Sequence, residues 1–515
     1  MPEDWEASHH TGSNRSFKLT QSWLQECTHE HPSCKSTGSP LPSRVVLITG
    51  PQKARIYQSR GEIENYACLS HCWGKIKIIQ TTLSTLKGYE EELPWEDLSL
   101  TFQEAISVAF RLGYKYIWID SLCIVQDDKK DWRHEGSRMS QIYAGAHLTI
   151  AATASSDGSG GCFRRYKTHS LTQISYPAAD GSELKLGIRL GVEDTRWHYS
   201  RLPLFGRAWA FQELLLSNRV LHCLEKELLW ECRTKTTFQL FTHESSIRRL
   251  SHTHSPSSLT EILSKNETEI ANRWSSIVRL YSGHQLTNEE DIFPALQGIS
   301  KHMSEHINSP YIAGLWEINI IQGLLWYAQS PVRPQKWRAP SWSWASMACA
   351  VTWDRTAWSP RGFTPFASHV TSQIKPVDLD EFGQLESGMI TLRGRCFRNR
   401  EEGVFCTDGV RRTGNIAYNK RPSWMNHIYD YFQDCNRFDG IRPHGEPLIP
   451  GQRAKTVLMG TCRSTYHFLI LRPVPMLYGT YERFAYMKLR RDPNFPGNLP
   501  GVFYFVGREE IIHII

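Results

Sequence analysis

In the first half of the chain, apolar runs of strand length alternate with segments that have a helical hydrophobic period. Three apolar runs, at residues 66–70, 116–120 and 147–153, are predicted to be buried strands. Between them, apolar side chains recur every three or four positions in residues 101–112 and 131–145, which predicts two helices. Strands that alternate with helices indicate an α/β fold. We therefore expect the three strands to lie parallel in one sheet, with the helices covering its faces.

The same pattern divides the chain into four regions. We expect an N-terminal extension over residues 1–63, an α/β domain over 64–220, a mostly helical region over 221–384 and a β-rich region over 385–515. The last region is assigned to strands because segments such as "GMITLRGRCF" and "STYHFLILRPV" are strand-like. Within the α/β domain, the alternating pattern of residues 171–199 predicts a pair of strands.

One nearly apolar stretch, residues 311–328, approaches the length of a membrane span. It carries Glu317, Asn319 and Gln322, so we expect a buried helix here and no membrane-spanning segment. The start of the chain, "MPEDWEASHHTGSNRS", is polar and lacks the apolar segment of a signal peptide.

The composition supports packed cores and does not point to nucleic acid. Of the 515 residues, 40% are hydrophobic, with 18 Trp, 20 Tyr and 21 Phe. A chain of this length is expected to form two or three domains. The 59 basic and 52 acidic residues leave a net charge of +7 without any run of five basic side chains, so nucleic acid is not an expected partner.

The cysteines indicate a reducing compartment. There are 13 of them, an odd number without a repeating frame, so we expect free thiols in a cytoplasmic protein. The segment "CTHEHPSC" places Cys27, His29, His31 and Cys34 close together, and their thiol and imidazole groups are ligands that zinc prefers. No second ligand pair with zinc spacing follows nearby, so no metal is assigned. Whether Cys27, His31 and Cys34 bind one is left open by the sequence.

The ends of the predicted strands carry candidate site residues. In open parallel sheets, ligands bind beyond the carboxyl ends of the strands. Ser70 ends the first strand, Trp73 and Gly74 follow it, and Asp120 ends the second. Gly74 permits a turn, and the Trp73 ring is able to stack on a planar ligand. The alternative is that Trp73 packs locally and Ser70 caps a backbone group.

Glu135 is the lone acidic residue on the apolar stripe of the predicted helix at 131–145. Burying a carboxylate is costly unless the group is paired or used, and the helix dipole favours an anion in the first turns. Glu135 is therefore a candidate catalytic residue. The alternative is a structural ion pair with an arginine such as Arg138 or Arg207.

Three further patterns suggest a local structure or a function. Thr101 and Glu104 have the spacing of a capping box at the start of a helix. Cys123 follows the second strand and is either a nucleophile or, more commonly, a small buried thiol. The "GSGG" of residues 158–161 lacks the lysine and spacing of a P-loop, so it is weak evidence for phosphate binding.

Three long segments resemble the three blocks of the fungal heterokaryon incompatibility (HET) domain in sequence, order and separation. They are "YACLSHCWG", "YIWIDSLCIVQDDKKDWRHEGSRMSQIYAGAHLTIAA" and "RAWAFQELLLSNRVL", and they cover about residues 64–220. Outside them, "WLQECTHEHPSC", residues 281–300 and "APSWSWAS" resemble flanking segments common in the same proteins. His71 and Cys72 depart from the pattern, since the family often has Tyr followed by a variable residue there.

The resemblance implies a role in fungal self/non-self recognition, in which such domains trigger programmed cell death. HET domains are proposed to be remote relatives of TIR domains, so the resemblance also implies a parallel, flavodoxin/TIR-like sheet. Some TIR domains cleave NAD with a glutamate on a helix shortly after a tryptophan. Trp132 and Glu135 offer a similar pair, spaced one residue closer than the usual TIR pattern.

Two functions of different classes follow from these expectations. The first is an NAD hydrolase that breaks the nicotinamide–ribose bond, with NAD as substrate and no cofactor. Glu135 would stabilise the oxocarbenium-like charge, Trp132 or Trp73 would stack on the substrate, and Ser70 and Asp120 would make polar contacts. The second is a non-catalytic signalling module, whose partners would be other death-signalling proteins or further copies of the chain.

Overall fold

The structure is a computed structural model that contains two compact units, Met1–Ser264 and Lys265–Ile515. The residues that it describes are 10–35, 38–75, 78–165, 171–177, 183–189, 202–239, 256–263, 265–328, 330–354, 356–358, 362–398, 455–462, 465–474, 477–490 and 508–515. The boundary between the units falls inside the region predicted to span 221–384. The three boundaries that divide the four regions stay predictions.

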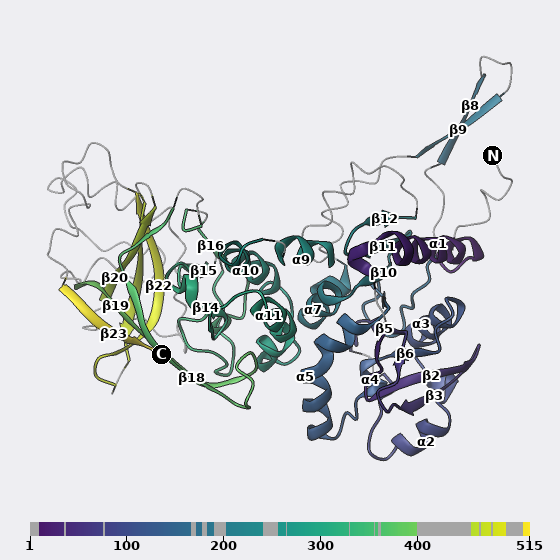
Figure 1. Ribbon diagram of the computed structural model, residues 1–515, viewed down its shortest axis with the longest axis horizontal. Helices are drawn as coiled ribbons and strands as arrows, with labels where there is room; N and C mark the ends of the chain where they lie inside the picture. The colour runs from purple at the N-terminus through teal and green to yellow at the C-terminus, as the bar shows by residue number, and fades with distance from the viewer. Residues whose placement is uncertain are drawn as a thin grey trace, which may run out of the picture. The chain divides into compact units, whose positions relative to one another are not determined.

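An eight-stranded mixed sheet forms the centre of the first unit (Figure 1). Its spatial order is β12-β11-β10-β7-β5-β6-β2-β3. The strands are β2 (Arg44–Gly50), β3 (Lys53–Gln58), β5 (Tyr66–Ser70), β6 (Tyr116–Trp118), β7 (Leu148–Ala151), β10 (Arg219–Cys223), β11 (Leu228–Cys232) and β12 (Thr236–Phe238). A two-stranded ribbon, β1 (Ser39–Pro40) with β4 (Ile63–Glu64), and the antiparallel pair β8 (Leu171–Pro177) and β9 (Glu183–Arg189) complete the strands described in this unit.

The three strands predicted from the apolar runs are confirmed as parallel neighbours. In β5, Cys68 pairs with Trp118 of β6 and with Thr149 of β7, both in parallel register. Strand β10 adds a fourth parallel strand beside β7. The second predicted strand ends early, at Trp118, because Asp120 begins the short helix α4 (Asp120–Cys123).

The sheet as a whole is mixed, because antiparallel strands flank the parallel centre on both sides. Strand β2 runs antiparallel to β6 and to β3, and β11 runs antiparallel to β10 and to β12. The β2–β3 and β10–β11–β12 connections are short turns. Such turns join only antiparallel neighbours, since a parallel pair needs a long crossover.

Counted along the chain, the four parallel strands lie in the spatial order second, first, third, fourth, which is β6-β5-β7-β10. The first strand, β5, therefore has neighbours that leave it in opposite directions across the sheet. In open α/β sheets, ligands bind at the carboxyl ends of the strands on either side of such a reversal. Here that place is the carboxyl edge of β5 and β7.

The helices described in the first unit pack on strands of the mixed sheet or on one another. They are α1 (Asn14–Glu30), α2 (Leu86–Glu91), α3 (Leu100–Arg111), α4, α5 (Lys129–Gly145), α7 (Ala208–Leu216) and α9 (Pro256–Leu263). Helix α3 packs against β2 and β6, and α7 packs against β5. Helix α5 is held to β5 by two buried hydroxyls, since Tyr143 donates to the carbonyl of Leu69 at 2.9 Å and Tyr66 donates to that of Ile142 at 2.7 Å.

The predicted capping box of Thr101 and Glu104 is wrong, because both side chains bind a distant loop. The N-cap of α3 is Ser99, whose hydroxyl accepts from the backbone N–H of Phe102. Glu104 Oε2 accepts from the backbone N–H groups of Cys162 and Phe163 at 2.5 and 2.8 Å. Thr101 Oγ1 accepts from the N–H of Gly161, so the end of the "GSGG" loop is tied to α3 through its own backbone donors.

The second unit confirms the predicted β-rich C-terminal region. A seven-stranded sheet has the order β17-β20-β21-β22-β23-β19-β18. Its strands are β17 (Thr364–Pro365), β18 (Ser368–Pro376), β19 (Leu385–Arg398), β20 (Lys455–Cys462), β21 (Thr465–Pro473), β22 (Thr480–Arg490) and β23 (Arg508–Ile514). Several elements of this unit come before the sheet in the chain. Among them are the helices α10 (Glu267–Tyr281) and α11 (Gln297–Ser304) and the antiparallel pair β15 (Trp326–Ala328) and β16 (Val351–Trp353).

The apolar stretch at 311–328 is not the single buried helix expected from its composition. It contains the hairpin β13 (Tyr311–Ile312) and β14 (Leu315–Trp316), the short helix α12 (Ile320–Gly323) and β15. The hairpin turn is Ala313–Gly314, and both residues have positive φ, 45° and 92°, as a type I′ turn requires. Among the described helices, none has the length and apolar character needed to cross a membrane.

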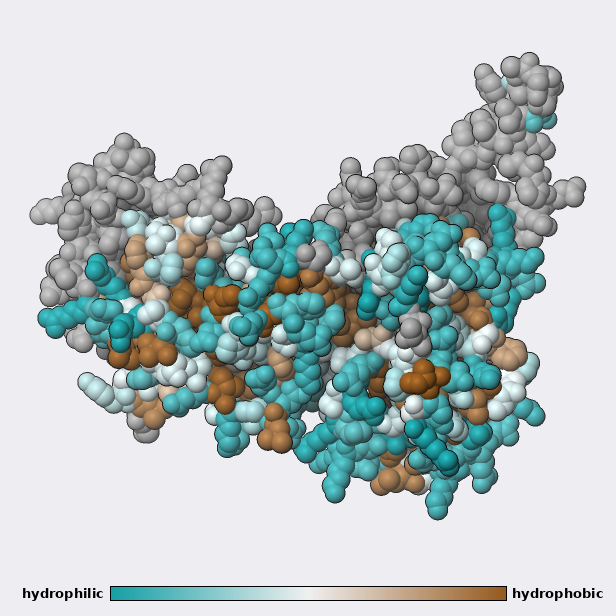
Figure 2. Space-filling view, viewed as in Figure 1, coloured by the Kyte–Doolittle hydropathy of each residue, from teal (hydrophilic) through white to brown (hydrophobic). Residues whose placement is uncertain are grey.

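Hydrophilic residues cover most of the described surface on the face shown in Figure 2, with scattered hydrophobic residues among them. The apolar side chains of the parallel strands lie in the interior instead. Every residue of β5, β7, β10 and β11 is buried. Any polar side chain on these strands is therefore removed from water, and its partners decide what it can do.

Candidate active site

The carboxyl end of β5 carries a buried hydroxyl–carboxyl pair. Ser70 is the last residue of the strand and has no exposed surface. Its Oγ donates a hydrogen bond to Oε2 of Glu213, at 2.5 Å. Glu213 lies on α7, the helix that precedes β10 in the chain, and only 2% of this residue is exposed. Two residues 143 positions apart in the chain thus meet at the edge where ligands bind in sheets of this type.

The Glu213 carboxyl is set to change charge near neutral pH. Burial raises its pKa to about 7, while the charge of Arg207 and the hydrogen bond from Ser70 act in the opposite direction. The nearby charge of Asp120 raises the pKa further. A carboxyl group with this pKa is present at neutral pH both as a carboxylate, which accepts a proton, and as the protonated acid, which donates one; this is typical of catalytic acids and bases.

Asp120 holds the ring of Trp73. The indole Nε1 donates to Asp120 Oδ2 at 2.7 Å, and Oδ1 accepts from the backbone N–H of Ser121 at 2.7 Å. Trp73 is partly buried against the core, and Gly74 beside it has a φ of 67°, where an added Cβ would lie 2.3 Å from Asp157. The indole is therefore fixed in orientation by a carboxylate and by a turn that only glycine fits.

His71 follows Ser70 in the chain, approaches Asp120 and is uncharged at neutral pH. Its Nδ1 is 3.8 Å from Asp120 Oδ1, and its ring meets Phe102 edge to face. Burial lowers the pKa of His71 to about 4, although Asp120 acts in the opposite direction. Within the described ranges, no group forms a hydrogen bond with His71 Nε2 or with the buried hydroxyl of Ser121. Both atoms carry the desolvation cost of an unmade hydrogen bond.

Arg207 connects the loop before α7 to the end of β5. Its guanidinium donates to the carbonyl oxygen of His71, and its positive charge favours the ionised form of Glu213. The sequence left open an ion pair between Arg207 and Glu135. In the structure, Arg207 instead binds the backbone carbonyl of His71, the residue that follows the end of β5.

Glu135 is buried on α5 but has a different environment. Only 1% of it is exposed, and its Oε1 lies 3.9 Å from Arg138 and 3.8 Å from His134. These distances are too long for hydrogen bonds, and neither carboxylate oxygen has a hydrogen-bond partner in the described part of the chain. The ion pair with Arg138 that the sequence left open is therefore present, but at 3.9 Å and without a hydrogen bond.

The structure joins only some of the residues singled out from the sequence. Trp73 binds Asp120, while Ser70 binds Glu213, whose pKa responds to the charge of Asp120. Trp132 and Glu135 both lie on α5, and Trp132 is 37% exposed. We call Ser70, His71, Trp73, Asp120, Arg207 and Glu213 the carboxyl-edge group. Across the described residues, no hydrogen bond or ion pair links Glu135 or Trp132 to it.

Glu213 is the functional candidate that the sequence analysis missed. The search for a lone acid on an amphipathic helix favoured α5, whereas α7 is buried all round, with Ala208 and every residue from 210 to 216 in the interior. The available signal was a glutamate inside a helix whose other residues, except Gln212, are all apolar. Such a residue needs a specific partner or a role, and Glu213 has Ser70.

Cys123 does not behave as a nucleophile. It is fully buried, and burial raises the pKa of its thiol to about 12. Since the thiolate is the reactive form, the group stays protonated and inert at neutral pH. The alternative of a small buried thiol describes this residue.

The "CTHEHPSC" segment forms a second cluster, around α1 and β11. The side chains of Cys27, His31 and Cys34 meet Cys232, the last residue of β11, and all four are buried. His29 is not part of the cluster. It is exposed, and its Nδ1 lies 2.8 Å from the carbonyl oxygen of Gln25 on the same helix.

The geometry defines an α/β domain whose candidate site lies at the carboxyl edge of a parallel sheet centre. Residues 66–213 match the family model described as "Heterokaryon incompatibility protein (HET)". The match begins with the first residue of β5 and ends on Glu213, so it includes the whole carboxyl-edge group. No curated protein and no solved structure matches the chain.

Proposed function

We propose that this protein acts in heterokaryon incompatibility, the self/non-self recognition of fungi that leads to programmed cell death, and that it does so in the cytoplasm. The support is the family match over residues 66–213. We further propose that the domain acts by cleaving NAD at the nicotinamide–ribose bond, with Glu213 as the catalytic residue. The flavodoxin/TIR-like relationship is part of this proposal.

Strand order and helix position support the TIR-like relationship. The order β6-β5-β7-β10 is that of the first four strands in flavodoxin-like sheets. Helix α7 follows the third parallel strand, β7, and carries Trp209 and Glu213. These two residues are one position further apart than Trp132 and Glu135, so they have the usual TIR spacing of a tryptophan and its glutamate.

The chemistry asks little of the protein beyond one well-placed carboxylate. The nicotinamide of NAD is already cationic, so it leaves without protonation, and the ribose develops oxocarbenium-like charge. The Glu213 carboxylate would stabilise that charge, with Ser70 fixing its orientation. Water then forms the new bond to the ribose carbon, and its proton is released, which gives nicotinamide and ADP-ribose.

Other groups at the same edge are suited to binding the substrate. The Trp73 indole, fixed by Asp120, is a stacking surface for a planar ring. His71 Nε2 and the Ser121 hydroxyl are buried polar atoms to which the described chain gives no hydrogen-bond partner, so a bound ligand or water would satisfy them. The observation that carries the proposal is the buried Ser70–Glu213 pair with a glutamate pKa near 7.

A non-catalytic signalling module is the second candidate. The observation that favours it is the burial of the same pair, since Ser70 has no exposed surface and Glu213 only 2%. In that case the carboxyl-edge network holds α7 against β5. The domain would then act by recruiting other death-signalling proteins or further copies of the chain.

The experiment is NAD turnover by the purified full chain, followed as nicotinamide release by chromatography. We expect Glu213→Gln to lower turnover by at least about 100-fold, because Gln keeps the hydrogen bond from Ser70 but removes the charge. Glu135→Gln, a second buried glutamate of the same unit, is the matched variant and should stay within a few-fold of wild type. The opposite ranking of the two variants would return the catalytic role to Glu135. A wild-type chain that releases no nicotinamide would favour the signalling module.

A further inference from the structure

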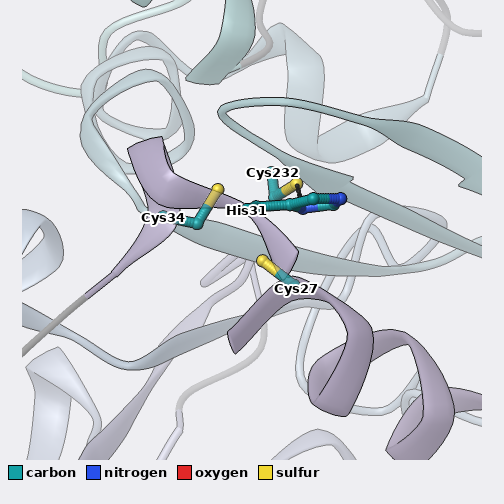
Figure 3. A group of neighbouring side chains, drawn as sticks. All are labelled: Cys27, His31, Cys34 and Cys232. Atoms are coloured by element: carbon teal, nitrogen blue, oxygen red, sulfur yellow. Dashed lines mark hydrogen bonds between the residues drawn. The ribbon is translucent and has the colours of Figure 1, made fainter. Parts of the chain in front are cut away.

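We propose that Cys27, His31, Cys34 and Cys232 together bind a structural zinc ion. Figure 3 shows the four side chains converging from α1, from the 3₁₀ turn η2 (Pro32–Cys34) and from β11. Three thiols and one imidazole form a complete tetrahedral ligand set of the kind that zinc prefers in structural sites. The proposal concerns a different part of the unit from the carboxyl-edge group and does not depend on NAD cleavage.

The distances fit one shared ion. The four ligand atoms all lie within 4.8 Å of one another, and Cys232 Sγ is 3.4 Å from His31 Nδ1. A tetrahedral zinc ion with bonds of about 2.3 Å to sulfur and about 2.0–2.1 Å to nitrogen holds its ligand atoms about 3.5–3.8 Å apart. The cluster is thus already at the scale of a zinc site.

Local structure explains how three ligands come from one short segment. Cys27 lies in the last turn of α1, His31 is the C-cap of that helix, and Cys34 ends η2. Spacings of three and two intervening residues are within the range of zinc-binding segments. The fourth ligand lies far along the chain, which is why a search for a nearby second pair found none.

Cys232 lies in a turn that points a backbone N–H group at its sulfur. The backbone N–H of Cys232 donates to the carbonyl of Lys235, and the backbone N–H of Lys235 donates to Cys232 Sγ at 3.3 Å. Arg219 Nε donates to Cys27 Sγ at 3.2 Å, and the Thr234 hydroxyl lies 3.6 Å from Cys34 Sγ. All three sulfurs therefore have a polar hydrogen-bonding group beside them. A zinc ion with three thiolates carries one net negative charge, which the Arg219 guanidinium balances.

His31 has the second contact that metal-bound histidines usually have. While Nδ1 faces the sulfur of Cys232, Nε2 lies 3.8 Å from Glu26 Oε1. Glu26 is in turn bound by the Lys235 ammonium at 2.6 Å. At 3.8 Å the Glu26 carboxylate makes no hydrogen bond with the imidazole, but its charge lies on the far side of the ring from the sulfur of Cys232, where a metal-bound histidine usually has a carboxylate.

Simple packing or a disulfide accounts for less of this arrangement. A disulfide would use two thiols and leave the third thiol and the histidine unexplained. Packed neutral thiols would not need an arginine and a backbone N–H aimed at their sulfurs. A buried set of four with no further ligand among the described neighbours matches a structural site rather than a catalytic one, which keeps an open position.

The ion would join the N-terminal segment to β11, the second strand from one side of the sheet. Residues 27–34 and Cys232 are about 200 positions apart, and Arg219 extends the connection by donating to the carbonyl of His147, just before β7, at 3.1 Å. Binding energy from the metal would thus stabilise the fold of the whole first unit.

The test is metal analysis of the full chain, purified without chelators, by plasma mass spectrometry. We expect one zinc ion per chain. Cys232→Ser should lower zinc affinity by more than the about 10–100-fold that loss of an outer contact costs. Cys68→Ser, which changes another buried thiol of the same unit, should retain zinc. Glu26→Gln should weaken zinc binding by about 10–100-fold, and the exposed Glu30→Gln on the same helix should not.

A second readout holds even if the ligand variants fold poorly. Wild-type chain in which zinc is exchanged for Co²⁺ should show the intense visible bands of tetrahedral, thiolate-bound cobalt. Titration of its thiols with a mercurial should release the metal. A wild-type chain that carries no zinc and gives no such cobalt spectrum would overturn the proposal, and so would iron or copper bound in place of zinc.

Discussion

Two buried residues at the carboxyl edge respond to pH in opposite directions. The pKa of Glu213 rises from 4.5 to about 7 on folding, so the folded state favours the neutral acid. Its contribution to stability is fully present below pH 4.5 and is lost as pH rises through 7. The pKa of His71 falls from 6.5 to about 4, so its contribution is present above pH 6.5 and is lost as pH falls through 4.

Glu213→Gln isolates the first of these effects. We expect the wild type to lose stability relative to this variant as the pH rises from 4.5 to 7, because only the wild type must then ionise a buried carboxyl. Thermal or urea unfolding of both proteins across this range measures the difference, and the His71 contribution cancels between them. A difference that does not vary with pH would mean that folding leaves the pKa of Glu213 near its ordinary value.

At the scale of elements, the attachment of α3 to the loop after β7 depends on one carboxylate. Glu104 accepts hydrogen bonds from two backbone N–H groups, those of Cys162 and Phe163. Glu104→Ala would leave both donors without this partner. We expect a loss of about 2–4 kcal/mol in the free energy of unfolding, since bonds to charged groups contribute about 1.5–3 kcal/mol each and partial access of water reduces the sum.

Urea unfolding measured by circular dichroism checks this value. The matched control is Glu91→Ala, which removes an exposed glutamate from α2 and should change stability by less than about 0.5 kcal/mol. Equal, small effects in the two variants would show that the loop does not need Glu104.

At the scale of the whole molecule, the chain forms two compact units with a sheet in each. The first has its own mixed sheet and a core of buried side chains from β2 to β11. We expect the fragment 1–264 to fold alone, because a unit with its own core has the means to do so. It should unfold cooperatively and give a dispersed amide NMR spectrum. A fragment that melts without a transition would show that this unit requires the rest of the chain.

Features that depend on neighbours in the sequence were predictable from it. The runs at 66–70, 116–120 and 147–153 are apolar over strand length, so local pattern was enough to identify β5, β6 and β7 and their parallel pairing. The HET resemblance rests on the same contiguous blocks. In contrast, the flanking antiparallel strands and the hairpin at Ala313–Gly314 were not expected, because backbone pairing and turn geometry decide them more than the hydrophobic period does.

The candidate sites depend on residues that only the folded chain brings together. By itself, the sequence determined the parallel centre of the sheet and located Ser70, Trp73 and Asp120 at or just beyond strand ends. It could not pair Ser70 with Glu213, or Cys232 with Cys27 and Cys34, because no local pattern encodes a contact between residues 143 or about 200 positions apart. The tertiary structure decided those pairs. Burial then gave Glu213 its raised pKa. The carboxylate of Glu135 has no hydrogen-bond partner among the described residues.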